Sequence, residues 1–144
     1  MSRYVVDASV AVKWLVPEVH SEAAFRLHHP EHELLAPDLL PTEVGNVLWR
    51  MIRRGELSRE AGHEGLRLLL ALPLNLFASA AIVEFALDIA NDTGRTVYDS
   101  LYLALATVEQ CQMVTADQRL HNAISGGPLD AHILWVEEFP ITDV

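Results

Sequence analysis

The feature that most constrains the fold of this chain is the alternation of short apolar runs with longer segments of helical periodicity. Short apolar runs typical of buried strands occupy residues 4–6, 34–36, 74–77, 113–115 and 133–136. Apolar residues recur at helical spacing in segments 8–15, 20–29, 38–54, 58–72, 80–93, 97–110 and 117–123. This alternation predicts an α/β fold with a central parallel sheet, whose functional groups gather at the carboxyl ends of the strands.

Local signals set the expected helix boundaries. The first helix should end before Pro17, and Gly55 and Gly94 should close the helices that precede them. Ser58 and Ser79 are expected to cap the helices that follow them. The segment 97–110 is apolar almost all round, which predicts a helix in the centre of the molecule.

Composition bounds the class of protein. With 144 residues, 51% hydrophobic and 21% charged, the chain is expected to form a single globular domain over residues 1–144. The lone Cys111 excludes an internal disulfide framework and favours a reducing, cytoplasmic setting. Asp7 and Lys13 interrupt the apolar N-terminus, which argues against a signal peptide. No run reaches the roughly 18 uncharged apolar residues of a membrane span, so no membrane association is expected.

The net charge limits the ways in which the protein can meet nucleic acid. Ten Lys and Arg against twenty Asp and Glu give a formal charge of −10. Proteins that bind nucleic acid by general phosphate neutralisation are basic. Any nucleic-acid function of this chain must therefore depend on local basic residues and on bound metal.

Acidic residues lie inside or directly beside strongly apolar runs at four points, namely Asp7, Glu43, Asp99 and Asp117. An unpaired charge in apolar surroundings costs roughly several kcal/mol to desolvate. A shared divalent cation would balance these charges, because Mg²⁺ takes oxygen ligands and is commonly held by one or two carboxylates with others in the outer shell. The pattern therefore favours a common metal site.

Each acid also has a purely structural explanation. Asp7 and Asp117 stand where an N-cap is expected, and Glu43 stands in the first turn of a helix, where the dipole favours an acid. Asp99 has few polar neighbours, and a salt bridge to Arg95 is its structural alternative. Taken singly, Asp7, Glu43 and Asp117 stay ambiguous, and Asp99 is the hardest to explain as structural.

Other chemistries have weaker support. The histidines of HHPEHE, at positions 28, 29 and 32, are expected to form a solvated cluster rather than a zinc site. The sequence contains neither a phosphate-binding GxxxxGK[ST] or GxGxxG motif nor a GxSxG nucleophile elbow.

The segments VVDASVAVKW, PTEVGNVLWR, VYDSLYLALA and TADQRL, in this order, resemble the acidic motifs of PIN-domain ribonucleases and are most similar to VapC-type toxins of type II toxin–antitoxin systems. The resemblance runs from residue 3 to about residue 136. Ser9, Asn46 and Thr115 match positions where such proteins place small polar groups around the acids.

The resemblance implies a three-layer α/β/α sandwich with a central parallel sheet, and endoribonuclease activity that depends on Mg²⁺ or Mn²⁺. It also implies a homodimer and a cognate antitoxin that occupies a groove by the active site. Asp7 and Asp99 are expected to bind the metal directly, with Glu43 and Asp117 completing the pocket through water or a second ion. Such a metal can generate hydroxide and stabilise charge on a phosphodiester.

Substrate phosphates need positive charge near the acids. Lys13 and Arg119 are the preferred candidates, and further candidates are Arg50, Arg53 and Arg54. Arg53 and Arg54 are explained equally well as cations at a helix C-terminus. Two functional alternatives stay open: a housekeeping PIN nuclease that processes RNA or cuts structured DNA, and a catalytically idle binding protein whose acidic pocket receives an arginine of a partner.

Overall fold

The computed structural model describes residues 2–141 and contains a five-stranded sheet in which every paired strand is parallel to its neighbour. The strands are β1 (Ser2–Val6), β2 (His32–Pro37), β3 (Asn75–Phe77), β4 (Gln112–Thr115) and β5 (Ile133–Trp135). Their order across the sheet is β3-β2-β1-β4-β5. The predicted α/β class and parallel sheet are confirmed.

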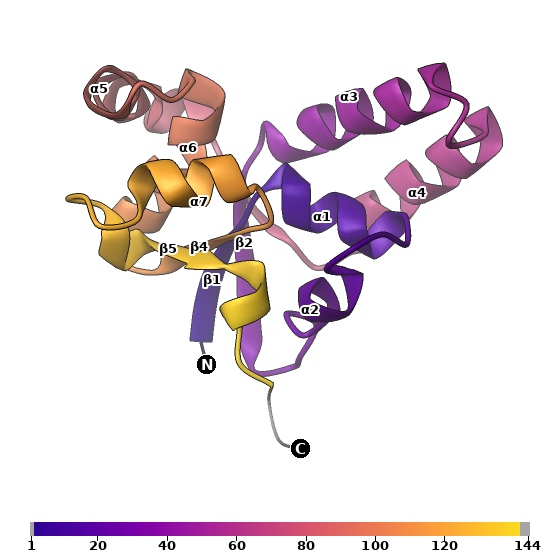
Figure 1. Ribbon diagram of the computed structural model, residues 1–144, viewed down its shortest axis with the longest axis horizontal. Helices are drawn as coiled ribbons and strands as arrows, with labels where there is room; N and C mark the ends of the chain where they lie inside the picture. The colour runs from indigo at the N-terminus through magenta and orange to yellow at the C-terminus, as the bar shows by residue number, and fades with distance from the viewer. Residues whose placement is uncertain (1, 142–144) are drawn as a thin grey trace.

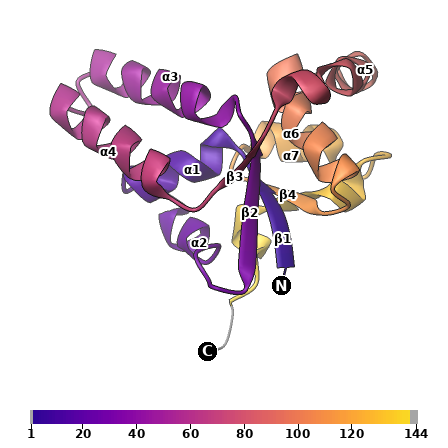
Figure 2. The same ribbon diagram turned by 180° about the vertical axis from the view of Figure 1, so that it is seen from behind.

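Helices cover both faces of this sheet. They are α1 (Ala8–Leu15), α2 (Ser21–Phe25), α3 (Leu40–Arg53), α4 (Arg59–Ala71), α5 (Val83–Thr93), α6 (Val97–Val108) and α7 (Gln118–Ile124). Helices α1 to α4 lie on one side of the sheet and α5 to α7 on the other, as the opposite views of Figure 1 and Figure 2 show. The molecule is therefore the three-layer α/β/α sandwich that the resemblance implies.

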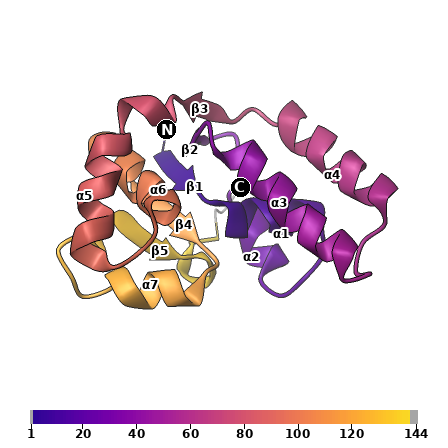
Figure 3. The same cartoon turned by 90° about the horizontal axis from the view of Figure 1, so that it is seen from above.

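The strand order creates a crevice at the carboxyl edge of the sheet. β1 lies in the middle, pairing with β2 on one side and with β4 on the other. Ligands of open α/β sheets bind where the order of strands reverses, outside their carboxyl ends. Asp7 directly follows β1, and Asp117 comes two residues after the end of β4. Figure 3 looks onto the molecule from above, with α3 and α6 on opposite sides of this edge.

The helix α6 forms the centre of its layer, as its apolar sequence predicts. Every residue from Ser100 to Ala106 is buried, and the helix packs on β1, β2 and β4. Its first turn projects past the sheet, with the Thr96 hydroxyl accepting a hydrogen bond from the backbone N–H of Asp99 at 3.1 Å. In the part of the chain that the structure describes, no helix has the length and apolar character needed to cross a membrane.

The helices α3 and α4 form an antiparallel hairpin that extends away from the sheet (Figure 1). Gly55 closes α3 with a φ of 75°, a left-handed conformation that glycine adopts without strain. Gly62 lets the two helices approach closely, because a Cβ at that position would lie 2.8 Å from Cδ1 of Ile52. The hairpin thus depends on glycine at both its turn and its contact.

Two predicted helix boundaries are wrong. The helix expected over 20–29 is only α2, since His20 takes a left-handed φ of 69° and the chain after Phe25 turns through hydrogen bonds between residues three apart. The helix expected over 80–93 starts at Val83, because Ser79 begins a short 3₁₀ turn (η1, Ser79–Ala81). The backbone N–H of Ser79 donates to Asp38 at 3.1 Å, which holds that turn against the end of β2.

Candidate active site

All four acids singled out in the sequence line one pocket at the carboxyl edge of the sheet. The pocket has a volume of about 280 Å³ and is lined by Asp7, Ala8, Ser9, Val12, Lys13, Glu18, Glu43, Val47, Arg50, Asp99, Tyr102 and Asp117. Each acid stands at the N-terminal end of a different helix, and these ends carry partial positive charge. Four segments far apart in sequence therefore bring carboxylates to one place.

Asp7 is the buried acid of the pocket, with 6% of its surface exposed. Its Oδ1 accepts hydrogen bonds from the Val10 N–H at 3.1 Å and the Ser9 hydroxyl at 2.6 Å, and its Oδ2 accepts one from the Thr115 hydroxyl at 2.6 Å. Burial raises the pKa of Asp7 to about 6, although these three hydrogen bonds oppose the rise. The three hydrogen bonds hold the Asp7 carboxyl group in position, whereas its burial disfavours the ionised form.

The hydroxyls around Asp7 join the two strand ends of the crevice. Ser9 Oγ accepts the N–H of Ala116 at 2.8 Å, and Thr115 Oγ1 accepts the N–H of Asp117 at 3.0 Å. The turn after β1 is thereby tied to the turn after β4. Ser9 and Thr115 are the small polar groups that the resemblance places around the acids.

Glu43 lies in the first turn of α3 and is half-buried. Its Oε1 has no contact with solvent and no hydrogen bond from any residue in the range 2–141. Burial, and then the negative charges of Asp7 and Asp99, raise the pKa of Glu43 to about 7. The positive charge of Arg50 and the Tyr102 hydroxyl oppose this rise but do not outweigh it.

Tyr102 is a member of the pocket that the sequence did not reveal. It lies one helical turn after Asp99 on α6, its residue is 1% exposed, and its hydroxyl has no well-formed hydrogen bond to any described residue. Burial first, and next the charge of Glu43, raise its pKa. The hydroxyl and the Glu43 carboxyl thus influence each other without good hydrogen-bond geometry. The three-residue spacing from Asp99 is the signal that could have identified it.

Asp99 is less buried than its apolar neighbours suggest. Arg95 donates from Nη2 to its Oδ2 at 3.1 Å, and 27% of the Asp99 side chain is exposed. The salt bridge considered as the structural alternative is therefore present. Asp99 is half-buried, because burial in α6 begins only at the next residue, Ser100.

Asp117 is the N-cap of α7. Its Oδ1 accepts the N–H groups of Arg119 at 3.0 Å and Leu120 at 3.2 Å. Asp7 caps α1 in the same way, through Val10. Asp7 and Asp117 thus both cap a helix and line the pocket. The structural explanation from the sequence, an N-cap, therefore does not exclude the functional one, a metal site.

The candidate substrate-binding cations lie in different places. Lys13 lines the pocket, where it is buried and its Nζ pairs with Oε1 of Glu18 at 3.0 Å. Arg50 lines the same pocket from α3. Arg119 is exposed on α7 and is not among the lining residues. Positive charge at the pocket wall therefore comes from Lys13 and Arg50.

The donor set fits a hydrated divalent cation. All four acids supply carboxylate oxygen, which Mg²⁺ and Mn²⁺ prefer. Within residues 2–141 no three His, Cys, Asp or Glu side chains already stand as a close ligand cluster, so the acids surround the space rather than converge on a point. Mg²⁺ usually keeps several of its waters. The raised pKa values of Asp7 and Glu43 are those of carboxyls that a cation would stabilise in their charged form.

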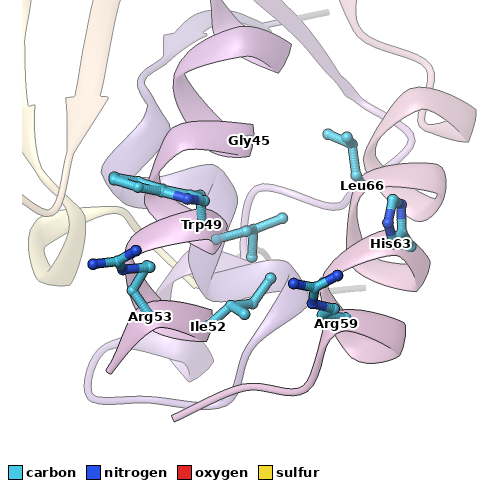
Figure 4. Close-up of a pocket in the computed structure, with 9 residues that line it drawn as sticks. Gly45, Trp49, Ile52, Arg53, Arg59, His63 and Leu66 are labelled. Atoms are coloured by element: carbon cyan, nitrogen blue, oxygen red, sulfur yellow. The ribbon is translucent and has the colours of Figure 1, made fainter. Parts of the chain in front are cut away.

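A second cavity of about 380 Å³ lies on the opposite face of α3, between α3 and α4 (Figure 4). Its lining residues are Gly45, Leu48, Trp49, Ile52, Arg53, Arg59, Gly62, His63 and Leu66. The Arg53 guanidinium lies 5.7 Å from the centre of the Trp49 ring. We name this cavity the hairpin groove. It has an apolar floor and cationic side chains, with no acid among its lining residues.

Comparisons with known proteins agree with this arrangement. A family model described as PIN domain matches residues 4–124. Ribonuclease VapC3 of Pyrobaculum aerophilum is 36% identical over 120 residues, 82% of this chain and 92% of that protein. The crystal structure of PAE2754 from Pyrobaculum aerophilum has a TM-score of 0.69 and 25% identity, covering 94% of this chain and 92% of that one. A toxin–antitoxin complex from Klebsiella pneumoniae, 12% identical, shares the fold with a TM-score of 0.57 over 91% of this chain and 95% of that one. The chain therefore belongs to the PIN-domain family, in its VapC branch.

Proposed function

We propose that this protein is the toxin of a type II toxin–antitoxin system, an endoribonuclease that hydrolyses RNA phosphodiester bonds with the help of Mg²⁺ or Mn²⁺. The observation that carries the proposal is the meeting of four carboxylates from four helix ends in one pocket. Membership of the VapC branch supports the choice of RNA as substrate. We further propose that residues 1–144 form one catalytic domain.

The residues have separate roles in this proposal. Asp7 and Asp99 bind the metal directly, and Glu43 and Asp117 complete the site through water or a second ion. When bound, the metal supplies hydroxide and stabilises charge on the phosphodiester. Before the metal binds, Glu43 has a pKa of about 7, so its carboxyl releases a proton when a cation enters the pocket.

Positive side chains would hold the substrate. The Lys13 ammonium at the pocket wall contacts a phosphate next to the cleaved bond, and Glu18 fixes its position. Arg119, exposed on α7, contacts a phosphate farther along the strand. Neutralising Lys13 and Arg119 together should weaken RNA binding and flatten its dependence on salt. An unchanged salt slope would argue against both contacts.

Sequencing of RNA ends tests the proposed activity. Purified protein is incubated with cellular RNA in Mg²⁺ or Mn²⁺, beside the Asp7→Asn variant and a metal-free control. New ends should appear only with wild-type protein and metal. Identical ends in all samples would refute the nuclease. A folded protein without turnover would favour the idle binding protein.

We propose the hairpin groove, on the face of α3 opposite the carboxylate pocket, as the site for the antitoxin, in place of the groove by the active site that the resemblance implies. The apolar floor of the hairpin groove suits the apolar face of a helix, a common mode of recognition, and its cations Arg53 and Arg59 suit acidic residues beside that face. Figure 4 shows these side chains on both walls, from α3 and α4. Trp49→Ala should weaken inhibition by a cognate antitoxin roughly tenfold or more, as expected for an aromatic hot spot. Unchanged inhibition would place the antitoxin elsewhere.

The homodimer implied by the resemblance is also a proposal. Analytical ultracentrifugation of the purified toxin at several concentrations tests it directly. A dimer mass that persists on dilution supports the proposal, and a monomer at all concentrations contradicts it.

A further inference from the structure

A second groove, of about 500 Å³, adjoins the carboxylate pocket. Glu43, Val47, Arg50 and Asp99 line both cavities, so the two spaces share a wall. A nucleic-acid strand whose phosphate reaches the carboxylates must continue beyond the pocket. The shared wall makes this groove, between α3 and the start of α6, a path for the neighbouring nucleotide.

Tyr98 forms one side of the groove. It is 62% exposed, and none of the described aromatic rings packs against it. It directly precedes Asp99 in the first turn of α6, which Thr96 caps. An exposed ring is thus held on a rigid element immediately beside a carboxylate of the pocket.

The other side of the groove is a polar stripe on α3. Thr42, Asn46 and Arg50 follow one another at four-residue spacing, which places them along one helix face, and all of them line the groove. Arg50 has no ion pair among residues 2–141, although its charge lowers the pKa of Glu43. The groove therefore offers an aromatic ring on one side and hydrogen-bond donors with one free cation on the other.

This combination matches an unpaired nucleotide. Single-stranded nucleic acid is bound by stacking of bases on aromatic side chains together with cationic contacts to the backbone. Bases in a duplex are stacked on each other and cannot reach such a ring. A duplex would also need broad positive charge, and this chain carries −10. We propose that Tyr98 stacks on the base of an unpaired nucleotide next to the cleaved phosphate, with Arg50 contacting its phosphate.

This inference rests on the proposed ribonuclease function and assigns the adjoining groove to the base of the nucleotide next to the cut. The binding assay uses fluorescein-labelled, unstructured RNA octamers in Ca²⁺ buffer, read by fluorescence anisotropy with the full chain. Tyr98→Ala should weaken binding roughly 5- to 100-fold, the range for stacking one base. Tyr98→Phe keeps the ring and should stay within about twofold of wild type.

Two controls separate stacking from other effects. Phe25, on α2, is 49% exposed and lies outside the groove, so Phe25→Ala should leave octamer binding unchanged. Octamers carrying abasic sites remove the base but keep the phosphates. On abasic octamers Tyr98→Ala should bind as wild type does, because no base remains to stack. A blunt-ended, fully paired RNA duplex should bind wild type more weakly than the octamer does, and the difference should shrink in Tyr98→Ala.

The outcomes distinguish this inference from the proposed function. If wild type cleaves RNA but Tyr98→Ala keeps both its octamer affinity and its kcat/KM, the stacking proposal is refuted and the ribonuclease stands. An equal loss on abasic and intact octamers, or no octamer binding by wild type, also refutes stacking. Tyr98-dependent binding without any cleavage supports the groove and refutes the nuclease. Loss of antitoxin inhibition in Tyr98→Ala, with RNA binding intact, would assign the groove to the antitoxin instead.

Discussion

The two faces of α3 border cavities of opposite chemistry. On one face Glu43, Val47 and Arg50 turn toward the carboxylate pocket, and on the other Trp49 and Ile52 turn toward the hairpin groove. The pocket collects negative charge, and its Glu43 Oε1 is buried without a hydrogen bond from the described residues. The hairpin groove exposes apolar surface and cations. One face of α3 thus suits a bound cation. The other face suits a partner that has an apolar surface bordered by acidic residues.

The two surfaces also lower the stability of the isolated chain for different reasons. The pocket holds carboxyls that burial and mutual repulsion keep from ionising freely, as the raised pKa values of Asp7 and Glu43 indicate. The hairpin groove instead leaves Trp49 more than half exposed. Charge and pH should therefore dominate the behaviour of the first surface, and packing that of the second.

The largest expected effect is on the acidic face. Glu43→Gln keeps the shape of the side chain but removes its charge, so RNA cleavage in Mg²⁺ should fall roughly 10²- to 10³-fold, the usual cost of removing one preorganised electrostatic contact. Steady-state cleavage of a defined RNA measures the loss. Glu64→Gln on α4, an exposed glutamate that does not line either cavity, is the matched control and should cleave as wild type does. Equal activity of both variants would remove Glu43 from the site.

The pH dependence of stability gives the next largest effect. The pKa of Asp7 rises on folding from its ordinary 3.8 to about 6, and that of Glu43 from 4.5 to about 7. Groups with raised pKa values stabilise the fold fully below pH 4, and this contribution is lost as the pH rises to about 7. For Asp7 the loss is about 3 kcal/mol, or a decrease in Tm of roughly 5–10 °C.

Thermal unfolding in EDTA between pH 4.5 and 8 measures this loss. Other groups titrate over the same range, so the comparison is made against Asp7→Asn, whose Tm should fall less steeply with pH. Mn²⁺ at pH 8 should raise the Tm of wild type far more than that of the variant, because the cation binds the ionised carboxyls. Parallel pH profiles for the two proteins would contradict the raised pKa assigned to Asp7.

The sheet and the meeting of the acids were predictable because they depend on patterns that act over short distances in sequence. Apolar runs next to Asp7 and Asp117 defined strand ends, and parallel topology brings strand ends to one edge. Glycines such as Gly55 set helix ends through their own backbone freedom. The helix α2 was mispredicted because its limits depend on the left-handed His20 and on turns after Phe25, which apolar periodicity does not encode.

The details of the pocket depend on distances that the sequence does not contain. Asp99 has the same apolar neighbours in sequence as a buried acid, but the extent to which α6 projects past the sheet decides its exposure. Tyr102 was not recognised as a pocket residue, because a tyrosine in an apolar helix is expected to be buried in the core in any case. The pairing of Lys13 with Glu18 depends on how the chain turns after α1. Residue types were therefore enough to predict the acids of the pocket, whereas its neutral and cationic members could be identified only from the structure.

A smaller effect is expected from the Tyr102 hydroxyl. Tyr102→Phe removes a donor that lies beside Glu43, so Mn²⁺ affinity should fall about tenfold, as for other groups that orient metal ligands. Stability should change little, because this buried hydroxyl makes no well-formed hydrogen bond to a described residue that would be lost. Titration calorimetry with Mn²⁺ and thermal unfolding in EDTA separate the two effects. Tyr4→Phe on β1, outside the pocket, is the control, and equal Mn²⁺ affinity in all three proteins would show that the hydroxyl has no part in metal binding.

The smallest effect tests the packing side of the comparison. A Cβ at Gly45 would meet no atom within 4 Å, because this position opens on the hairpin groove. Gly45→Ala should therefore stabilise the isolated toxin by about 0.5–1 kcal/mol through helix propensity. At Gly62 the Cβ would lie 2.8 Å from Ile52, so Gly62→Ala should gain less or destabilise. Urea unfolding measures the stability of both variants.

The methyl group at position 45 occupies space proposed for the antitoxin, so the Gly45→Ala variant should also bind the antitoxin more weakly. Greater stability with unchanged antitoxin affinity would mean that the antitoxin does not fill the hairpin groove. The two faces of α3 would then differ in chemistry without both serving as binding sites.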